Sequence, residues 1–340
     1  QVIQPIVKMY DEHTFISTCL FTEWIYNLNK FLERVIPFIT PTSVILGIIF
    51  STYIKDFTFL VPWLFAFMTF EGSLSMNFNA LKGALMHPFP VIVILFILHI
   101  IMPLWALTFG YIVFPSDELT ITGITLGMII PTGISSFIWV AMKKGNTALT
   151  LSIILIDSLL SPFVIPLSLS ILFGKTVEMN VGAMMSGLFF MIVLPSLLAI
   201  GLNELTKGKA SKSVKPILAP ISKLFLAVVV MLNGSAVAPY FYQIDLKLIL
   251  IILSVLIVAL SGYFISYVVA KMLRFNNETL IACTFSGGMR NISAGAVIAI
   301  HYFPAAVVLP VICGMLFQQI LASLYGVILD KKLQSSKKTL

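Results

Sequence analysis

Long apolar stretches follow one another along most of the chain, separated by short polar connections. A helix needs about 20 predominantly apolar residues to cross a bilayer. The pattern predicts ten membrane-spanning helices, at residues 35–51, 57–77, 89–115, 119–142, 147–173, 180–203, 217–241, 246–271, 277–301 and 303–328. The predicted fold class is therefore an all-α membrane protein.

Two of the predicted spans, the fourth and the ninth, carry glycine and small polar residues near their centres. The sequences are PTGISS at 131–136 and SGGMRNIS at 286–293. Proline removes a helical hydrogen bond and glycine loosens the turn, so both spans are expected to be broken there. The ninth span comes five spans after the fourth. Because five is odd, the two broken spans cross the membrane in opposite directions, which predicts two inverted five-helix repeats. Matching breaks in inverted repeats point to the binding site of a secondary transporter, while a simple kink at Pro131 is the alternative.

A new half-helix is expected to begin after each break, near Ser135 and near Asn291. The N-terminus of a helix favours an anion because its free N–H groups and its dipole are positive. The candidate substrate-binding residues lie at the two breaks and are Thr132, Gly133, Ser135, Ser136, Arg290, Asn291 and Ser293.

Arg290 lies about half way along the ninth predicted span. An arginine at that depth costs roughly 2.5–3.5 kcal/mol even on a lenient insertion scale, so it should face a cavity or a partner. Its guanidinium matches a carboxylate, phosphate or sulfate. Asp157 in the fifth span is expected either to form a salt bridge with Arg290 or to carry a proton. The other ion-coupling candidates are His99, Thr150 and Ser286.

Charge adds a topology to this picture. Of the 340 residues, 59% are hydrophobic and only 10% are charged, against about 25% in soluble domains. When the spans are threaded alternately, most Lys and Arg residues fall on one side, which the positive-inside rule places in the cytoplasm together with both termini. The net charge of +7 is thus attributed to topology and contact with anionic lipid, and no nucleic-acid partner is expected. The expected location is the plasma membrane.

The chain divides into six segments on this basis. They are an N-terminal cytoplasmic or interfacial segment (1–34), the first five-helix repeat (35–173), the start of the second repeat (174–202), a flexible cytoplasmic loop (203–216), the rest of the second repeat (217–328) and a basic cytoplasmic tail (329–340).

Four motifs carry a resemblance to a known family: HPFPVIVILFILHIIMP (87–103), PTGISSFIWVAMKKGNTALTLS (131–152), LLSPFVIP (159–166) and GMRNISAGAVIA (288–299). In order and spacing the chain resembles the bile acid:sodium symporter family. The resemblance implies a panel domain made of spans 1, 2, 6 and 7, and a core domain made of spans 3–5 and 8–10. It also implies that spans four and nine cross at their unwound centres, and that Asn291 contacts the substrate.

The resemblance further implies two sodium sites, and here the chain departs from the family. The corresponding positions hold Leu98, Ser136, Phe137, Thr150, Ile154, Ser286 and Arg290. A hard cation needs several oxygen ligands, and neither set supplies enough. We expect no cofactor and no sodium at these sites, with a proton as the alternative coupling ion. The hypothesis is that the fixed charge of Arg290 takes the electrostatic place of a bound sodium ion.

The predicted function is secondary active transport of a small organic anion that resembles pantoate, a 2-oxo acid or a bile acid. One alternative is a metalloid exporter of the arsenite type, which would carry a cysteine in the fourth span; this span has none. A second is an intramembrane enzyme, but the clustered carboxylates or Ser-His, HExxH and Asp-pair motifs of such enzymes are not found. A channel is the third. The chain is expected to be a transporter and not an enzyme.

Overall fold

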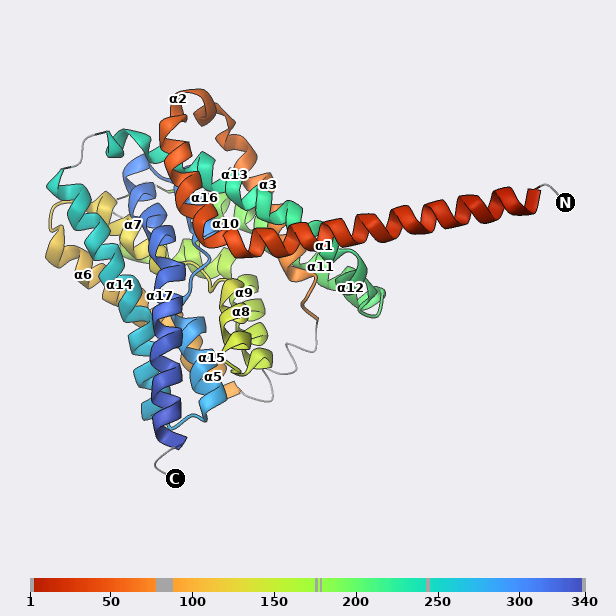
Figure 1. The fold of residues 1–340 in the computed structure, drawn as a ribbon. Helices are drawn as coiled ribbons and strands as arrows, with labels where there is room; N and C mark the ends of the chain where they lie inside the picture. The colour runs from red at the N-terminus through yellow and green to blue at the C-terminus, as the bar shows by residue number, and fades with distance from the viewer. Residues whose placement is uncertain (1–2, 78–87, 175–176, 178, 243–244, 338–340) are drawn as a thin grey trace.

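The computed structural model describes residues 3–77, 88–174, 177, 179–242 and 245–337, with side chains described for 23–35 and from 38 to 332 outside those gaps. Within these ranges the secondary structure is helical apart from one isolated bridge (Figure 1). In chain order the elements are α1 (Ile3–Ile49), α2 (Ser51–Ile54), η1 (Lys55–Leu60), α3 (Val61–Ser73), α5 (Pro88–Phe96), η2 (Ile97–Ile101), α6 (Met102–Val113), α7 (Glu118–Ile129), α8 (Ser135–Met142), α9 (Thr147–Phe173), α10 (Val181–Leu188), η3 (Phe189–Val193), α11 (Leu194–Leu205), α12 (Lys209–Ser213), α13 (Lys215–Phe241), α14 (Leu246–Met272), α15 (Asn277–Gly288), α16 (Ile292–Tyr302) and α17 (Ala305–Lys337).

Six uninterrupted helical stretches in the described chain are long and apolar enough to cross a membrane. They are Pro88–Val113, Thr147–Phe173, Val181–Leu205, Lys215–Phe241, Leu246–Met272 and Ala305–Lys332. Each overlaps one of the predicted spans. Large apolar side chains such as Trp63 (76% exposed) and Ile171 (80% exposed) lie on the outer surface, as expected of a protein that lipid surrounds.

The fourth and ninth predicted spans are broken, as the sequence indicates. The fourth consists of α7 and α8 with residues 130–134 between them, and the ninth of α15 and α16 with residues 289–291 between them. α8 begins at Ser135, and Asn291 is the N-cap of α16, so both half-helices start where the sequence predicts.

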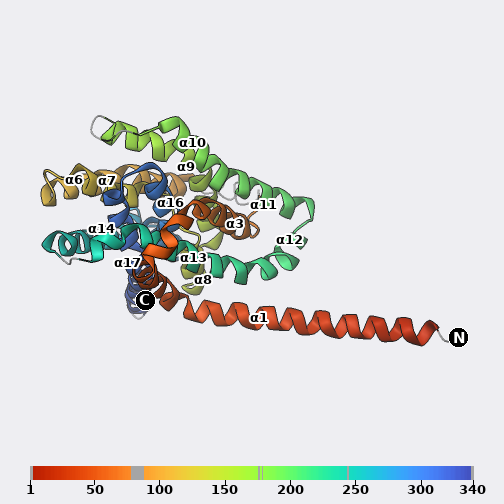
Figure 2. The same cartoon turned by 90° about the horizontal axis from the view of Figure 1, so that it is seen from above.

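The first two predicted spans differ from expectation. α1 bends by 75° between Glu23–Val35 and Phe38–Ile49, and counting this bent pair would raise the candidate spans from six to seven. Its N-terminal part extends away from the other helices in both views (Figures 1 and 2). α3, in the second predicted span, has only 13 residues and is preceded by the 3-10 turn η1.

The predicted flexible loop at 203–216 is instead largely helical. α11 continues to Leu205, and the short helix α12 follows before α13 begins. The Asn203 side chain donates to the Met76 carbonyl (3.1 Å) and accepts from the Ser211 N–H (3.2 Å). One amide thus bonds both the segment that follows α3 and the helix α12, which the polar composition of the connection did not reveal.

Contacts at the two ends of the bundle agree with an alternating path of the chain. At one end Lys143, after α8, pairs with Asp330 of α17, and the Asn146 N–H donates to the Glu278 carbonyl at the start of α15. At the other end Asp117, the N-cap of α7, pairs with Lys247 at the start of α14 at 2.7 Å. Two of the lysines counted in the positive-inside assignment, Lys82 and Lys175, lie outside the described residues.

Candidate functional site

The two breaks meet and bond to each other through their backbones. An isolated antiparallel bridge pairs Thr132 with Arg290. The Asn291 N–H donates to the Pro131 carbonyl at 2.7 Å. Backbone groups that the broken helices leave free therefore find partners in the opposite break, which a membrane interior requires.

Gly133 makes the close approach of the two segments sterically feasible. Its N–H donates to the Met289 carbonyl at 3.4 Å. A Cβ atom at this position would lie 2.9 Å from the Arg290 carbonyl oxygen, nearer than real Cβ contacts allow. The position has to be glycine because the backbone of the other break occupies the space that a side chain would need.

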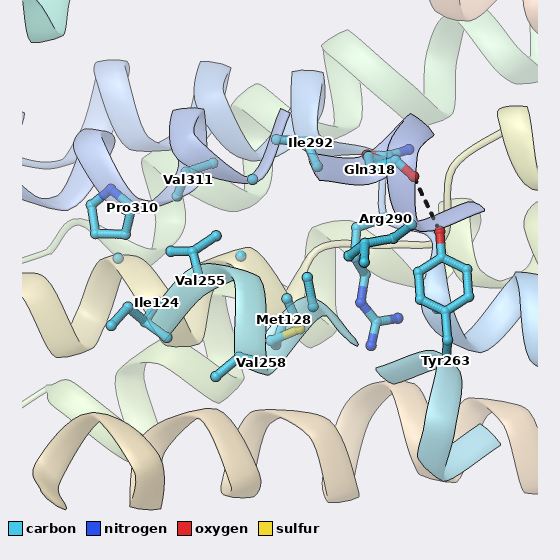
Figure 3. A pocket seen from close by; sticks show the side chains of 16 residues that line it. Ile124, Met128, Val255, Val258, Tyr263, Arg290, Ile292, Pro310, Val311 and Gln318 are labelled. Atoms are coloured by element: carbon cyan, nitrogen blue, oxygen red, sulfur yellow. Dashed lines mark hydrogen bonds between the residues drawn. The ribbon is translucent and has the colours of Figure 1, made fainter. Parts of the chain in front are cut away.

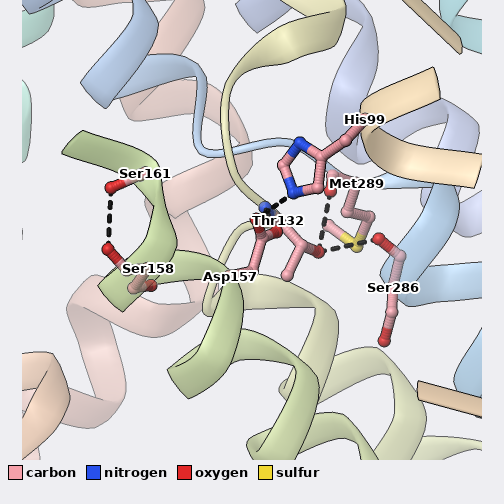
Figure 4. Close-up of polar contacts among 7 residues, drawn as sticks. All are labelled: His99, Thr132, Asp157, Ser158, Ser161, Ser286 and Met289. Carbon is pink, nitrogen blue, oxygen red and sulfur yellow. Dashed lines mark hydrogen bonds and ion pairs between the residues drawn. The ribbon is translucent and has the colours of Figure 1, made fainter. Parts of the chain in front are cut away.

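Asp157 of α9 bonds to the backbone of the first break (Figure 4). Its buried carboxylate accepts the Thr132 N–H at 2.6 Å, and its other oxygen lies 2.8 Å from His99 Nε2. The Thr132 hydroxyl donates to the Ser286 carbonyl at 2.7 Å. The expected salt bridge between Asp157 and Arg290 is wrong, because the two carboxylate oxygens are bonded to His99 and to the Thr132 backbone.

His99 lies on the π-helical segment η2, which has a local cause. Pro103 has no N–H to donate to the His99 carbonyl four residues earlier. The Met102 N–H bonds instead to the Ile97 carbonyl, five residues back. The wider turn belongs to a class that is frequent at functional sites.

Arg290 is buried on the opposite side of the crossing, with 3% of its surface exposed. None of its three guanidinium nitrogens has a hydrogen-bond partner within the described residues. Figure 3 shows the guanidinium directed between Met128 of α7 and Tyr263 of α14. It lines a narrow, partly open cavity between α7, α14 and α17.

The cavity wall is mainly apolar. Besides Arg290, its side-chain polar groups belong to Gln318 and Tyr263. Tyr263 donates its hydroxyl to the Gln318 carbonyl (3.4 Å), and the Gln318 side chain donates to the Ser135 hydroxyl (3.3 Å). Ser135, at the start of α8, is thereby linked to the rim of the cavity.

Arg290 and Asn291 do not face the same space, although the sequence placed both in one site. The second break is extended, so alternate residues point to opposite sides. Gly288, Arg290 and Ile292 line the cavity, while Asn291 does not. The Asn291 side chain accepts the Ala294 N–H at 3.3 Å and caps α16.

The remaining candidates surround the crossing without lining the cavity. Ser293 is half-buried in the first turn of α16. The hydroxyls of Ser136 and Ser286 are buried and have no hydrogen-bond partner in the described part of the chain. Thr150 donates its hydroxyl to the Asn146 carbonyl at 3.0 Å.

Two functional candidates, Gln318 and Tyr263, were missed by sequence reasoning. Gln318 and Gln319 form a polar pair inside the apolar stretch 303–328, and that pair was the available signal. Tyr263 carried no signal, because a tyrosine within an apolar helix is ordinary.

The model of the SBF-like CPA transporter family matches residues 53–334. The "Uncharacterized protein YbaS" of Bacillus subtilis is 51% identical over 87% of this chain and 96% of its own length. The "Uncharacterized sodium-dependent transporter YocS" of the same organism is 23% identical over 90% of this chain and 96% of its own length. The "Probable sodium/metabolite cotransporter BASS1, chloroplastic" of Arabidopsis thaliana is 22% identical over 83% of this chain and 70% of its own length.

Proposed function

The chain belongs to the SBF-like CPA transporter family, and on that premise we propose that it carries small organic anions across the membrane by alternating access. It is a multi-pass membrane transporter and not an enzyme, as the family and its sodium-dependent and cotransporter relatives show. The proposed part is the substrate class, a monoanion with an apolar body such as pantoate or a 2-oxo acid. Bile-acid-like anions belong to the same class and form a separate arm of the test.

One observation carries the substrate class: a buried guanidinium with no described partner lines a cavity beside the crossing. A charge buried without a partner is costly, so natural proteins retain it chiefly where it serves function. The fork of Arg290 donors fits a carboxylate, and the apolar wall fits a hydrocarbon body.

A second cavity supports a route to Arg290. It lies near the starts of α7, α14 and α17, and its charged lining residues are Lys247 and Asp245. Thr120 of this cavity is one helical turn from Gly123 and Ile124 of the first. The three helices that surround Arg290 near their middles thus also line a second cavity, with Lys247, near their starts.

The architecture that we propose has ten spans in two inverted repeats. Counting the two broken spans, α3 with η1, and the second part of α1 together with the six long helices gives ten. α1, α3, α11 and α13 pack on one another as a panel, and α5–α9 with α14–α17 form a core around the crossing. Rocking of one against the other would open the crossing to either side. We place both termini in the cytoplasm and the protein in the plasma membrane.

Sodium is not the coupling ion in this proposal. The hydroxyls of Ser136, Thr150 and Ser286 provide few oxygen ligands, and the Asp157 carboxylate is already bonded on both oxygens. Arg290 supplies a permanent positive charge next to this position. The names of the relatives include sodium, so sodium dependence is measured directly.

Ligand-induced thermal stabilisation of the purified protein tests the proposal, with pantoate, pyruvate and taurocholate, each with and without sodium. A ligand at 100 times its Kd stabilises by about 2.7 kcal/mol. Wild type and the control Arg34→Ala, which removes an exposed arginine of α1, should gain this stabilisation from at least one anion without sodium. Arg290→Ala should gain none.

Counterflow of the stabilising anion in proteoliposomes then distinguishes a carrier from a channel. External labelled anion should accumulate transiently when the vesicles are loaded with the unlabelled anion. A strict requirement for sodium, or an Arg290→Ala protein that performs counterflow like the wild type, would contradict the proposal.

A further inference from the structure

His99 and Asp157 form a buried acid–base pair that the substrate cavity does not use. His99 Nε2 and Asp157 Oδ1 lie 2.8 Å apart, although the residues are 58 positions apart in the chain. The Asp157 side chain is fully buried, and 12% of the His99 side chain is exposed. His99 Nδ1 is itself buried and has no hydrogen-bond partner in the described part of the chain. Because Nε2 is held by the carboxylate, Nδ1 is the nitrogen at which a proton can bind or leave.

The pair is connected to the crossing through a single residue. The Thr132 N–H donates to the second oxygen of Asp157 at 2.6 Å, and Thr132 is bridged to Arg290. A change of charge at the pair therefore acts directly on the first break, whose backbone is bridged to that of Arg290.

Few other titratable groups face the pair from the elements packed against it. α5, α8, α10 and η3 contain none. α6 and α7 bring Tyr111 and Glu118, which bond to each other near the ends of their helices at 3.2 Å. α15 brings Glu278 in its first turn and the buried thiol of Cys283. Beyond these, the charge nearest the crossing is that of Arg290.

The net charge at the crossing depends on the protonation state of His99. Arg290 contributes +1 and ionised Asp157 contributes −1, so the site is neutral while His99 is neutral. A proton on His99 Nδ1 makes the site +1, which a bound monoanion neutralises. Histidine is the side chain suited to this change near neutral pH.

We propose that the His99–Asp157 pair is a proton-binding site that couples the transport of one proton to one monoanion. This inference rests on the proposed function and deepens it by naming the coupling ion. The proton binds to Nδ1 from one side of the membrane while Nε2–H stays on Asp157. The same proton leaves Nδ1 toward the other side after the anion has crossed, so no other reactant is needed.

Proteoliposomes with a pH gradient test the coupling, with labelled pantoate and labelled pyruvate as probes and with the membrane potential clamped by potassium and valinomycin. One pH unit, acid outside, should raise accumulation by the wild type up to about tenfold. His99→Gln should lose this increase. His301→Gln makes the same chemical change at the exposed end of α16 and should keep it. Protein-free vesicles correct for diffusion of the uncharged acid.

Counterflow without a gradient separates the two proposals. Its absence in the wild type contradicts the anion carrier. Counterflow in the wild type together with no effect of the gradient overturns the proton site and leaves the carrier standing. A gradient effect that survives in His99→Gln also overturns the assignment to this pair.

The protonation state of the His99 ring is measured without any substrate, by NMR of protein labelled with ¹⁵N-histidine in nanodiscs. The chain has four histidines, and His99→Gln identifies the signals of His99 by their loss. These signals should change from the neutral to the charged ring as the pH is lowered from 9 to 5. Asp157→Asn removes the negative charge 2.8 Å from Nε2 and should change the titration of these signals. A ring with one protonation state throughout, or an unchanged titration in Asp157→Asn, overturns the proposal.

Discussion

The break between α7 and α8 and the break between α15 and α16 contribute different chemistry to one crossing. At the first break, Thr132 donates its N–H to Asp157 and its hydroxyl to two carbonyls of the other broken span. At the second break, Arg290 pairs through its backbone only, and its guanidinium has no partner among the described residues. One break thus fixes the geometry of the crossing, while the other places an unpaired charge beside it.

This difference separates stability from function in a way that mutations can test. Substitutions at the first break should change mainly the stability of the fold. Substitution of the Arg290 side chain should change mainly the binding of an anion. The predictions below run from the largest expected effect to the smallest.

Arg290→Met should abolish function without loss of stability. We expect anion affinity to fall by about 30-fold to several thousand-fold, because removing one member of a buried charge pair typically costs about 2–5 kcal/mol. The ligand-free protein should melt at the same or a higher temperature, since a buried charge without a partner is replaced by an apolar side chain. Ligand titration and thermal unfolding of the same sample measure both quantities. A lower melting temperature in the ligand-free state would show that Arg290 is a structural residue.

Gly133→Ala should force the two breaks apart. The new methyl group would meet the Arg290 carbonyl oxygen at 2.9 Å, and overpacking of this kind costs about 1–3 kcal/mol. Gly201→Ala in α11 is the matched control, because no atom lies within 4 Å of its added methyl group. The free energy of unfolding in detergent should fall for the first variant and stay equal or rise for the second. Equal effects at both positions would refute the close approach at the crossing.

Thr132→Val removes the hydroxyl that ties the first break to the second. The hydroxyl has one hydrogen, which it directs to the Ser286 and Met289 carbonyls at 2.7 and 3.0 Å, so the loss amounts to one hydrogen bond, about 1 kcal/mol. Thr132→Ser keeps the hydroxyl and should retain most of the stability. Thermal unfolding of the two variants measures the difference. If they were equally stable, the hydroxyl would not contribute to holding the crossing.

The sequence predicted the long spans and the positions of the breaks well, for a local reason. The predicted spans 147–173 and 246–271 correspond to Thr147–Phe173 and Leu246–Met272. Apolar length sets such helices, and capping residues such as Asn146 and Asp245 mark where they start. The breaks were visible because proline and glycine act on the backbone wherever they occur.

Pairings between distant residues were not predictable in the same way. The sequence analysis paired Asp157 with Arg290 because both residues are charged and lie inside the membrane. In the structure the carboxylate of Asp157 in α9 bonds to His99 in η2 instead. The opposite directions of Arg290 and Asn291 follow from an extended backbone, and a strict alternation rule applied to the second break would have separated them. The bend in α1 falls where the sequence has Pro37, a signal that the span prediction did not use, whereas the helix α12 had no signal in the apolar pattern.

The smallest predicted effect concerns how the two broken spans begin. α7 starts with a charged cap, Asp117, which accepts the Thr120 N–H at 3.2 Å and pairs with Lys247, whereas α15 starts with the neutral cap Asn276. Burial alone would raise the pKa of Asp117, but hydrogen bonds from Lys247 and Thr120 outweigh it and lower the pKa below its usual value. A lowered pKa means that the folded state binds the proton less tightly than the unfolded state. The stabilisation is therefore present above about pH 4 and is lost as the pH falls through the pKa of the folded state.

Asp117→Asn makes the start of α7 resemble the start of α15, because asparagine keeps the cap and removes the charge. At pH 7 the variant should be less stable by under about 1 kcal/mol, the usual worth of a solvent-accessible ion pair. Thermal unfolding from pH 7 to pH 3 should show this difference shrinking below pH 4, since the unfolded wild-type chain then binds a proton that the folded carboxylate, paired with Lys247, takes up only at a lower pH. High salt at pH 7 should reduce it as well. A difference that stays constant down to pH 3 would show that the cap geometry, and not the ion pair, distinguishes the two broken spans at their starts.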